Sequence, residues 1–391
     1  MEALRNPYSP GAGTPPPALV GRDTEIANFE VAVERLALGR ADRSQMLIGL
    51  RGVGKTVLLR EFSNTAARRG WVCQHLECVE DTNLAQAAAN LSRTAILDLS
   101  AGKRMAEWGS RALGVLKSFQ LAWEIPSGGS VTLGFDPDPM PGRADSGDFG
   151  RDLTDLFRAV SQLAKERETG VLLAIDEIQH LHAERLTPLL VALHEISQLQ
   201  LPLVVAGAGL PSLFGLLGEA RSYAERLFAF SSIDRLNRES AIEALEAPAL
   251  GEGVEWEDAA LHELVEATAG YPYFLQEFGK QAWRVAPGPA RITRADVLTA
   301  VPLAMEELDK GFFNVRIDRA TKAERDYLVA MSSLGADRCR SSDVAKRLGR
   351  TTRQVSPIRD SLIKRGLCFA PAHDVIAFTV PMFDEFLKRR F

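Results

Sequence analysis

Residues 49–56 have the sequence Gly49-Leu50-Arg51-Gly52-Val53-Gly54-Lys55-Thr56, which matches the pattern G-x-x-x-x-G-K-[ST]. The glycines of this pattern let successive backbone N–H groups turn inward and surround phosphate oxygens. The lysine, here Lys55, reaches the β- and γ-phosphates, and the hydroxyl of Thr56 is placed to ligate Mg²⁺. The stretch therefore predicts a loop that binds a nucleoside triphosphate, expected to be ATP with Mg²⁺.

The residues on either side of this loop support the prediction. Met46-Leu47-Ile48 is a short apolar run that is typical of a buried strand, and a helical pattern extends from Val57 to Arg69. A helix that starts at the loop points the positive end of its dipole at a bound anion. The residues expected to contact the nucleotide here are Gly49, Gly52, Val53, Gly54, Lys55, Thr56 and Val57.

A second candidate site follows another apolar run. Val171-Leu172-Leu173-Ala174-Ile175 has the length of a strand buried on both faces, and two carboxylates, Asp176 and Glu177, come directly after it. Asp176 is predicted to hold Mg²⁺ through water. Glu177 is predicted to be the catalytic residue that orients and deprotonates the attacking water. The alternative is that the two residues form only a salt bridge at the end of a strand.

Strand and helix patterns alternate through the first part of the chain. Runs of strand length occur at 71–78, 171–175, 201–206 and 228–233, and helical spacing occurs between them. This alternation predicts an α/β fold with a parallel sheet. Beyond residue 238 we expect helices only, up to about residue 310. The resulting division is a Pro- and Gly-rich arm without a core of its own at 1–18, an α/β nucleotide-binding domain at 19–238, a helical part at 239–318, and a third unit at 319–391.

Residues 100–150 interrupt the alternation. Phe119, Leu121, Trp123 and Ile125 alternate, and Val131, Leu133 and Phe135 do the same beyond a Pro-Ser-Gly-Gly turn. This pattern predicts a β-hairpin within an insertion. The insertion would either cover an edge of the fold or contact a partner.

The unit at 319–391 has the pattern of a winged helix-turn-helix. A helix is expected from Thr321 to Met331, and Ser342 is expected to cap a second one that ends at Gly349. A third helix would end at Arg365-Gly366, and two strands at 367–369 and 375–380 would form the wing. In such a unit the third helix enters the major groove of DNA.

The start of the third helix is open to two interpretations. Thr351-x-x-Gln354 forms a capping box, which would put Pro357 inside the helix at the loss of one backbone hydrogen bond. Alternatively, Ser356 is the cap and Pro357 is the first helical residue. We prefer the second interpretation.

The charge distribution points to a partner for this unit. Residues 320–391 carry 14 Lys and Arg against 8 Asp and Glu, whereas the whole chain has a net charge of −5. A basic end on an acidic body indicates a polyanion, and double-stranded DNA is the candidate partner. The alternatives are a solvated helical face and a winged helix that contacts protein. The basic side chains near the third helix are Arg350, Arg353, Arg359, Lys364 and Arg365.

At these residues the chain resembles the AAA+ ATPases, and within them the group of archaeal-type ATPases, origin-recognition-like initiators and STAND regulatory ATPases. Besides Gly49–Thr56 and Val171–Glu177, the resemblance is carried by Leu19–Arg22, Gly207–Pro211 and Gly270–Gln276. It implies that Val20, Gly21 and Arg22 lie against the adenine. It also implies that 207–211 hold the first sensor of the γ-phosphate, and that Pro272 belongs to a helical lid over the nucleotide.

Two departures from the family pattern bear on hydrolysis. The first sensor of the family usually carries Asn, Ser or Thr, but residues 204–209 contain only Val, Ala and Gly. Tyr273 stands where the lid of fast enzymes in the family often has Arg. Both changes remove polar groups that stabilise the charge on the transferred phosphate, so we expect slow hydrolysis.

The resemblance also implies an arginine finger that acts on a neighbouring subunit. Arg226 lies just before the last predicted strand, where the family has this residue, and Arg221 is the second choice. Such a role requires a homo-oligomer. The alternative is that Arg226 forms a helix salt bridge with Glu225 or Glu219.

Other features exclude whole classes of protein. The four cysteines form no CxxC pair, which argues against a metal cluster. No signal peptide is evident, and the longest uncharged run, Leu201–Gly218, is broken by prolines and glycines, so we expect a cytoplasmic protein without a membrane partner. The expected function is a slow ATPase acting as a nucleotide-controlled DNA-binding factor. The alternatives are a STAND-like switch of protein assembly and an ATP-binding scaffold.

Overall fold

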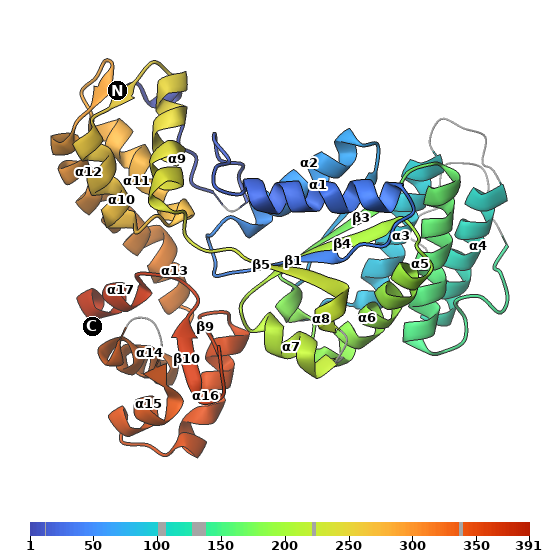
Figure 1. The fold of residues 1–391 in the computed structure, drawn as a ribbon. Helices are drawn as coiled ribbons and strands as arrows, with labels where there is room; N and C mark the ends of the chain where they lie inside the picture. Colours follow the sequence, from blue (N-terminus) through green and yellow to red (C-terminus); the bar gives the residue numbers. More distant parts are fainter. Residues whose placement is uncertain (12, 101–106, 127–137, 221–223, 336–338) are drawn as a thin grey trace.

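The structure, a computed structural model, describes all residues except 12, 101–106, 127–137, 221–223 and 336–338. Its centre is a five-stranded parallel sheet with the strand order β2-β3-β4-β1-β5 (Figure 1). The strands are β1 (Ser44–Ile48), β2 (Val72–Glu77), β3 (Val171–Asp176), β4 (Leu203–Gly209) and β5 (Phe228–Ser232). The predicted parallel α/β fold is therefore confirmed, and all five predicted strands are present.

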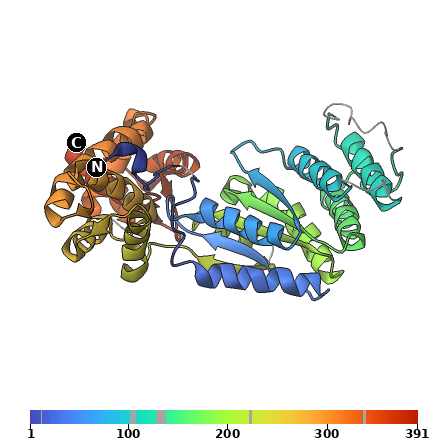
Figure 2. The same cartoon turned by 90° about the horizontal axis from the view of Figure 1, so that it is seen from above.

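Helices cover both faces of the sheet because its central strands are apolar on both sides. Leu47 and Val204 belong to an apolar cluster with α1 (Asp23–Ala37) and α2 (Lys55–Arg68). The alternate residues of the same strands belong to a second cluster with α5 (Phe149–Glu166), α6 (Ala183–Gln198) and α7 (Leu213–Ala220). Figures 1 and 2 show α1 and α2 on the opposite side of the sheet from α6 and α7.

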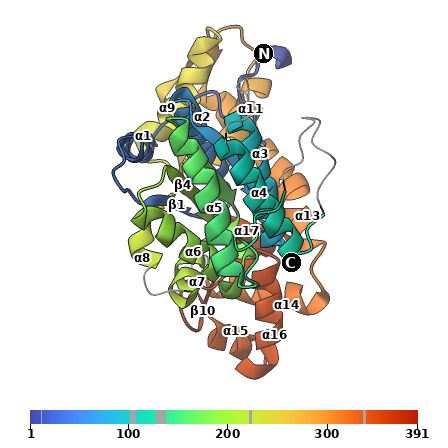
Figure 3. The ribbon, with the colours of Figure 1, turned by 90° about the vertical axis from the view of Figure 1, so that its right-hand side faces the viewer.

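The first strand of the β-hairpin that was predicted in residues 100–150 is absent from the described residues, so that part of the prediction is wrong. Residues Glu107–Ala122 form helix α4, which packs with α3 (Leu84–Ser100) and α5 beside the sheet (Figure 3). Ala112, Val115, Leu116 and Phe119 are buried at helical spacing. These residues form a long apolar face with helical spacing. The short alternation at the end of this face is compatible with a helix as well as with a strand, so the helix forms. The second predicted strand lies outside the described residues.

Parallel pairing brings the carboxyl ends of the strands to one edge of the sheet. Ile48 at the end of β1 pairs with Gly209 of β4, and Ile175 near the end of β3 pairs with Gly207. The loop 49–56, the acidic pair Asp176 and Glu177, and the segment after β4 therefore meet at this edge.

The helical part beyond the sheet, which we call the lid, consists of α9 (Arg238–Gly251), α10 (Asp258–Thr268), α11 (Pro272–Val285) and α12 (Arg294–Glu307). It also contains a short parallel pair, β6 (Glu255–Trp256) with β7 (Arg291–Ile292). The expectation that residues 239–310 form helices only is thus wrong. A pairing of two residues has no periodic pattern by which the sequence reveals it.

The N-terminal arm lies along the lid and contributes to its core. Tyr8 is 3% exposed, accepts a hydrogen bond of 2.9 Å from Trp256 Nε1, and donates its hydroxyl to Leu245 O. Trp283 Nε1 donates to Glu2 O at 3.0 Å. Apart from the short helix η1 (Ala3–Arg5), the described residues of the arm form no helix or strand. Contrary to the expectation of an arm without a core, Met1 and Tyr8 belong to the packing of the lid.

The remaining residues form the C-terminal unit, which follows the π-helical segment η3 (Leu308–Phe313) and the short helix α13 (Asn314–Ile317). An antiparallel sheet has the order β8-β10-β9. The sequence of helix, strand, two helices and two strands is the one expected for a winged helix-turn-helix. The elements are α14 (Lys322–Leu334), β8 (Cys339–Arg340), α15 (Ser341–Arg347), α16 (Thr352–Lys364), β9 (Cys368–Phe369), β10 (Val375–Phe378) and a final helix α17 (Phe383–Arg390).

Two helix starts in this unit differ from expectation. Thr351 caps α16 in a reciprocal capping box with Gln354, so Pro357 lies inside the helix. Two reciprocal hydrogen bonds outweigh the one bond lost at an exposed proline. Ser342 does not cap α15, because its N–H and hydroxyl both donate to the carboxylate of Asp374. Over the described residues, no helix has the length and apolarity needed to cross a membrane.

Candidate nucleotide-binding site

The loop between β1 and α2 has the geometry of an anion-binding site. Gly54, with φ 95°, precedes the first turn of α2 in the left-handed region that favours glycine. Lys55 is 6% exposed, and its Nζ donates to Gly49 O at 2.9 Å and to Leu50 O at 2.7 Å. Burial lowers the pKa of Lys55 to about 8. The described residues place no carboxylate within ion-pair distance of Nζ, so the lysine is available to a phosphate.

A hydroxyl and a carboxylate meet where the magnesium site is expected. Thr56 Oγ1 donates to Asp176 Oδ2 at 2.6 Å, across the edge of the sheet. Oxygen atoms of this kind are the ligands that Mg²⁺ prefers. The pair therefore fits a Mg²⁺ ion, which Thr56 would hold directly and Asp176 through water. When bound, Mg²⁺ neutralises phosphate charge.

Glu177 is held in place by a residue that the sequence analysis missed. It has φ 53°, an unusual value for a residue other than glycine, and its Oε2 accepts a hydrogen bond from Gln179 Nε2. Gln179 Oε1 in turn accepts a hydrogen bond of 3.0 Å from Leu210 N, just after β4. Gln179 therefore connects the expected catalytic carboxylate to the segment expected to sense the γ-phosphate.

A cavity of about 380 Å³ lies over this loop, and the arm, the loop and the lid form its walls. Arg22 joins the loop to the segment between β5 and the lid, because its Nη2 donates to Val53 O at 3.2 Å and to Asp234 O at 2.6 Å. Tyr273 N donates to Gly52 O at 3.2 Å and so links the lid to the loop. The residues predicted to contact nucleotide that line the cavity are Val20, Arg22, Gly52, Val53, Gly54, Lys55, Thr56, Val57 and Pro272, with Glu177 beside them. Gly21 and Gly49 are near it in the chain but do not line it.

Other cavity-lining residues were not found by sequence reasoning. The arm contributes most of 9–18, and Gly13 O accepts a hydrogen bond of 2.6 Å from Arg60 Nη1 of α2. Arg51, Phe312 and Arg316 line the cavity as well. No motif marks these positions, because they reach the cavity only through the packing of distant segments.

The expected arginine finger lies away from this cavity. Arg226 is exposed in the short helix α8 (Ala224–Leu227), immediately before β5. Within the described ranges it forms no ion pair with Glu225 or Glu219, so that alternative is not supported. Arg221 lies outside the described residues.

The basic residues of the C-terminal unit fall into two groups. Arg365 Nε lies 3.4 Å from Glu324 Oε1, and the Arg359 side chain is 20% exposed beside Asp360. Arg353 and Lys364 are exposed. Arg347 and Arg350, at the turn between α15 and α16, are exposed too. In the part of the chain that the structure describes, Arg347, Arg350 and Arg353 form no ion pairs.

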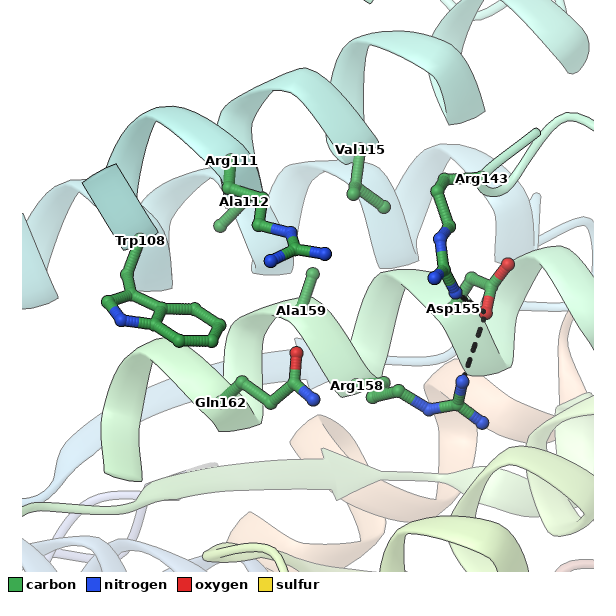
Figure 4. A pocket seen from close by; sticks show the side chains of 9 residues that line it. All are labelled: Trp108, Arg111, Ala112, Val115, Arg143, Asp155, Arg158, Ala159 and Gln162. Carbon is green, nitrogen blue, oxygen red and sulfur yellow. Dashed lines mark ion pairs between the residues drawn. The ribbon is translucent and has the colours of Figure 1, made fainter. Parts of the chain in front are cut away.

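A smaller pocket of about 130 Å³ lies between α4 and α5, away from all of these residues (Figure 4). Arg111, Arg143 and Arg158 extend toward it. Arg158 lies 3.6 Å from Asp155 and also pairs with Glu195, while Arg143 lies 3.9 Å from Asp155. None of the predicted site residues lines this pocket.

Comparison with known families agrees with the geometry at the edge of the sheet. Residues 18–206 match the family model described as AAA ATPase domain. This chain carries an AAA+ P-loop ATPase domain. Residues 310–387 match a second model, described as a domain of unknown function. No curated protein matches the chain. A domain of this family implies, in general terms, an NTPase that binds and hydrolyses ATP.

Among solved structures, the likeness of this AAA+ chain is distant. The Aeropyrum pernix ORC1 protein in complex with DNA is 14% identical, with a TM-score of 0.48 over 99% of this chain and 96% of that one. The Thermotoga maritima RuvB Holliday junction branch migration motor is 15% identical, with a TM-score of 0.45 over 91% and 92%. Drosophila ORC bound to DNA is 14% identical, with a TM-score of 0.45 over 100% and 90%. No function follows from values this low.

Proposed function

We propose that the AAA+ domain binds ATP with Mg²⁺, hydrolyses it slowly, and thereby controls duplex DNA binding by the C-terminal unit, acting as a winged helix. The observation that supports this coupling is a direct contact. Arg51 N, inside the phosphate-binding loop, donates a hydrogen bond of 3.2 Å to Thr379 O, just after β10. A change in that loop when nucleotide binds therefore acts directly on the C-terminal unit.

The residues around the cavity support slow hydrolysis. β4 ends in Ala206-Gly207-Ala208-Gly209, which offers no side chain that hydrogen-bonds to phosphate. Tyr273 at the start of α11 is not a cation. We propose Glu177 as the base and Arg226 as a residue that acts on a neighbouring copy of the chain.

Exposed arginines support contact with DNA. Arg347, Arg350 and Arg353 surround the turn that precedes α16 and the first turn of that helix, which is the part of a helix-turn-helix that meets the major groove. Their guanidinium groups are free to neutralise phosphates. Arg359 and Arg365 are weaker candidates than they were from the sequence alone, because carboxylates hold both.

The test is fluorescence anisotropy of a labelled duplex titrated with the full chain at low salt, once with ATP and Mg²⁺ and once with ADP and Mg²⁺. The proposal expects tighter binding with ATP, and loss of that difference in Lys55→Ala. Phosphate release in the same samples reports hydrolysis. If the chain does not bind the duplex with either ATP or ADP, the proposed DNA binding is wrong.

A second candidate, a STAND-like switch of protein assembly, is favoured by a different observation. Ile363 and Lys364 at the end of α16 face His180 and Leu210 of the ATPase domain across a cavity of about 360 Å³. The C-terminal unit therefore lies against the ATPase domain, as in a closed switch. Light scattering that shows a nucleotide-dependent mass, without duplex binding, would favour this candidate.

A further inference from the structure

One wall of the nucleotide cavity comes from the junction between the lid and the C-terminal unit. Phe312 and Arg316 line the cavity together with Lys55, Thr56 and Glu177. Both belong to the segment formed by η3 and α13. A π-helical turn such as η3 is rare and is often found at functional sites. Phe312 and Arg316 also lie within 310–387, outside the part that matches the ATPase family.

Aromatic stacking orients the Arg316 guanidinium. Its Cζ lies 3.8 Å from the centre of the Phe312 ring, and its Nη1 donates to Phe312 O at 2.5 Å. The Phe312 ring also stacks on Tyr273, with ring centres 4.9 Å apart and planes at 24°. Tyr273 therefore supports the ring that carries a cation, at the position where the family resemblance expected a cation itself.

Two cations in this cavity have no anionic partner. Within the described part of the chain, neither Arg316 nor Arg51 forms an ion pair, and both are partly buried. Arg51 Nε is buried without a hydrogen-bond partner. Burial and then the charge of Arg51 lower the pKa of Arg316 to about 10, so Arg316 still carries its charge at neutral pH. Like charges held close together and partly dehydrated are unfavourable unless an anion lies between them.

Arg51 also connects this cavity to the wing. Besides the bond from its N–H to Thr379 O, its guanidinium lies so close to Gly366 that a Cβ there would be 2.6 Å from Nη2. Gly366 follows the end of α16, and its lack of a side chain leaves room for Arg51. If a ligand displaces Arg51, the displaced side chain and backbone would therefore act on the end of α16 and on the wing.

We infer that Arg316, together with Arg51, binds the terminal phosphate of ATP within the same chain, so that the junction between the lid and the C-terminal unit distinguishes ATP from ADP. This inference rests on ATP binding in the proposed function and adds the residues that read the phosphate. It also assigns a role to Tyr273, which positions Phe312 and, through it, Arg316. ADP, which lacks the terminal phosphate, leaves the two guanidinium groups repelling one another.

The experiment is calorimetric titration of the full chain with Mg²⁺ and ATP, and with Mg²⁺ and ADP, for the parent and for Arg316→Ala. The variant is expected to lose about 10- to 100-fold in ATP affinity, the usual range for a hydrogen bond to a charged group, and less than about twofold in ADP affinity. Arg316→Lys keeps the positive charge, so its ATP affinity should lie between that of the parent and that of Arg316→Ala. Arg319→Ala is the matched control, because it removes an exposed arginine of the same segment that does not line the cavity.

The outcomes separate the inference from the proposed function. Equal losses for ATP and ADP, or unchanged affinity for both, would overturn the inference while ATP binding stands. A parent chain that binds neither nucleotide would overturn both. If Arg316→Ala does not fold, as judged by circular dichroism, Phe312→Leu removes the supporting ring and should show the same selective loss of ATP affinity; equal losses in that variant would also overturn the inference.

Discussion

Two pockets of this molecule contain several arginines, and they differ in what balances the charge. In the pocket between α4 and α5, Asp155 lies near Arg143 and Arg158, and Glu195 pairs with Arg158 (Figure 4). In the nucleotide cavity, Lys55, Arg51 and Arg316 have no ion pair among the described residues. Arg143 and Arg158 are already paired and Arg111 is exposed to solvent, so that pocket is stable without a ligand, whereas unpaired, partly buried cations require an anion.

The two pockets also differ in their connections. The α4–α5 pocket is formed by two neighbouring helices and by Arg143 of the segment that connects them. The nucleotide cavity joins the arm, the phosphate-binding loop, the lid and the junction to the C-terminal unit. A ligand in the second cavity contacts parts that can move relative to one another, which is the requirement for a switch.

The largest expected difference between the pockets is in ATP binding. Lys55→Ala should abolish binding in a calorimetric titration, because it removes the buried cation that faces the phosphates. Arg158→Ala removes a cation from the other pocket and should leave the ATP affinity within about twofold of the parent, since the site is separate. Comparable loss in both variants would contradict the contrast drawn between the pockets.

The next effect concerns turnover. Glu177→Gln keeps the shape of the side chain and its contact with Gln179 but removes the base, so phosphate release should fall about 10²- to 10⁴-fold while ATP stays bound. Asp155→Asn is the matched change in the other pocket and should not alter the rate. A rate in Glu177→Gln equal to that of the parent would show that Glu177 is not the base.

The effect of pH should be confined to the nucleotide cavity. Because the pKa of Lys55 is lowered to about 8, the lysine of the free protein loses its proton above that pH, and ATP must then bind with uptake of a proton. The ATP affinity should be constant below pH 8 and should fall by up to about tenfold per pH unit above it. Calorimetry at pH 9 in buffers of different ionisation enthalpy measures the proton uptake, and an absence of uptake would contradict the assignment.

The smallest expected effect is in DNA binding. Arg350 and Arg353, in contrast to Arg359 and Arg365, have no carboxylate partner in the part of the chain that the structure describes. Changing Arg350 and Arg353 together to Ala should therefore lower the slope of log affinity against log salt concentration by roughly 2, at about 0.9 per phosphate contact. Arg359→Ala is the matched single control and should change the slope little. A slope that responds to Arg359 and not to the pair would reverse our choice of contact residues.

Sequence alone predicted those features that local patterns encode. The loop 49–56, the strand before Asp176, the parallel sheet, and three helices and two strands of the C-terminal unit follow from motifs or periodicity, whereas β8 and α17 were not predicted. Arg316 and Gln179 were missed because their roles depend on packing between segments far apart in the chain. The same reason applies to Ser342, whose partner Asp374 lies in another loop. Residues 107–122 form a helix, although a short alternation of apolar residues near its end led to the prediction of a strand.

The most direct test of the central claim is a crystal structure of the full chain with Mg²⁺ and a non-hydrolysable ATP analogue. We predict that the terminal phosphate lies within hydrogen-bonding distance of Lys55 and of the Arg316 guanidinium, and that the α4–α5 pocket holds no nucleotide. A terminal phosphate that contacts Lys55 but lies out of reach of Arg316 would contradict the claim that the junction before the C-terminal unit binds this phosphate. A nucleotide bound anywhere else would contradict the account of the site itself.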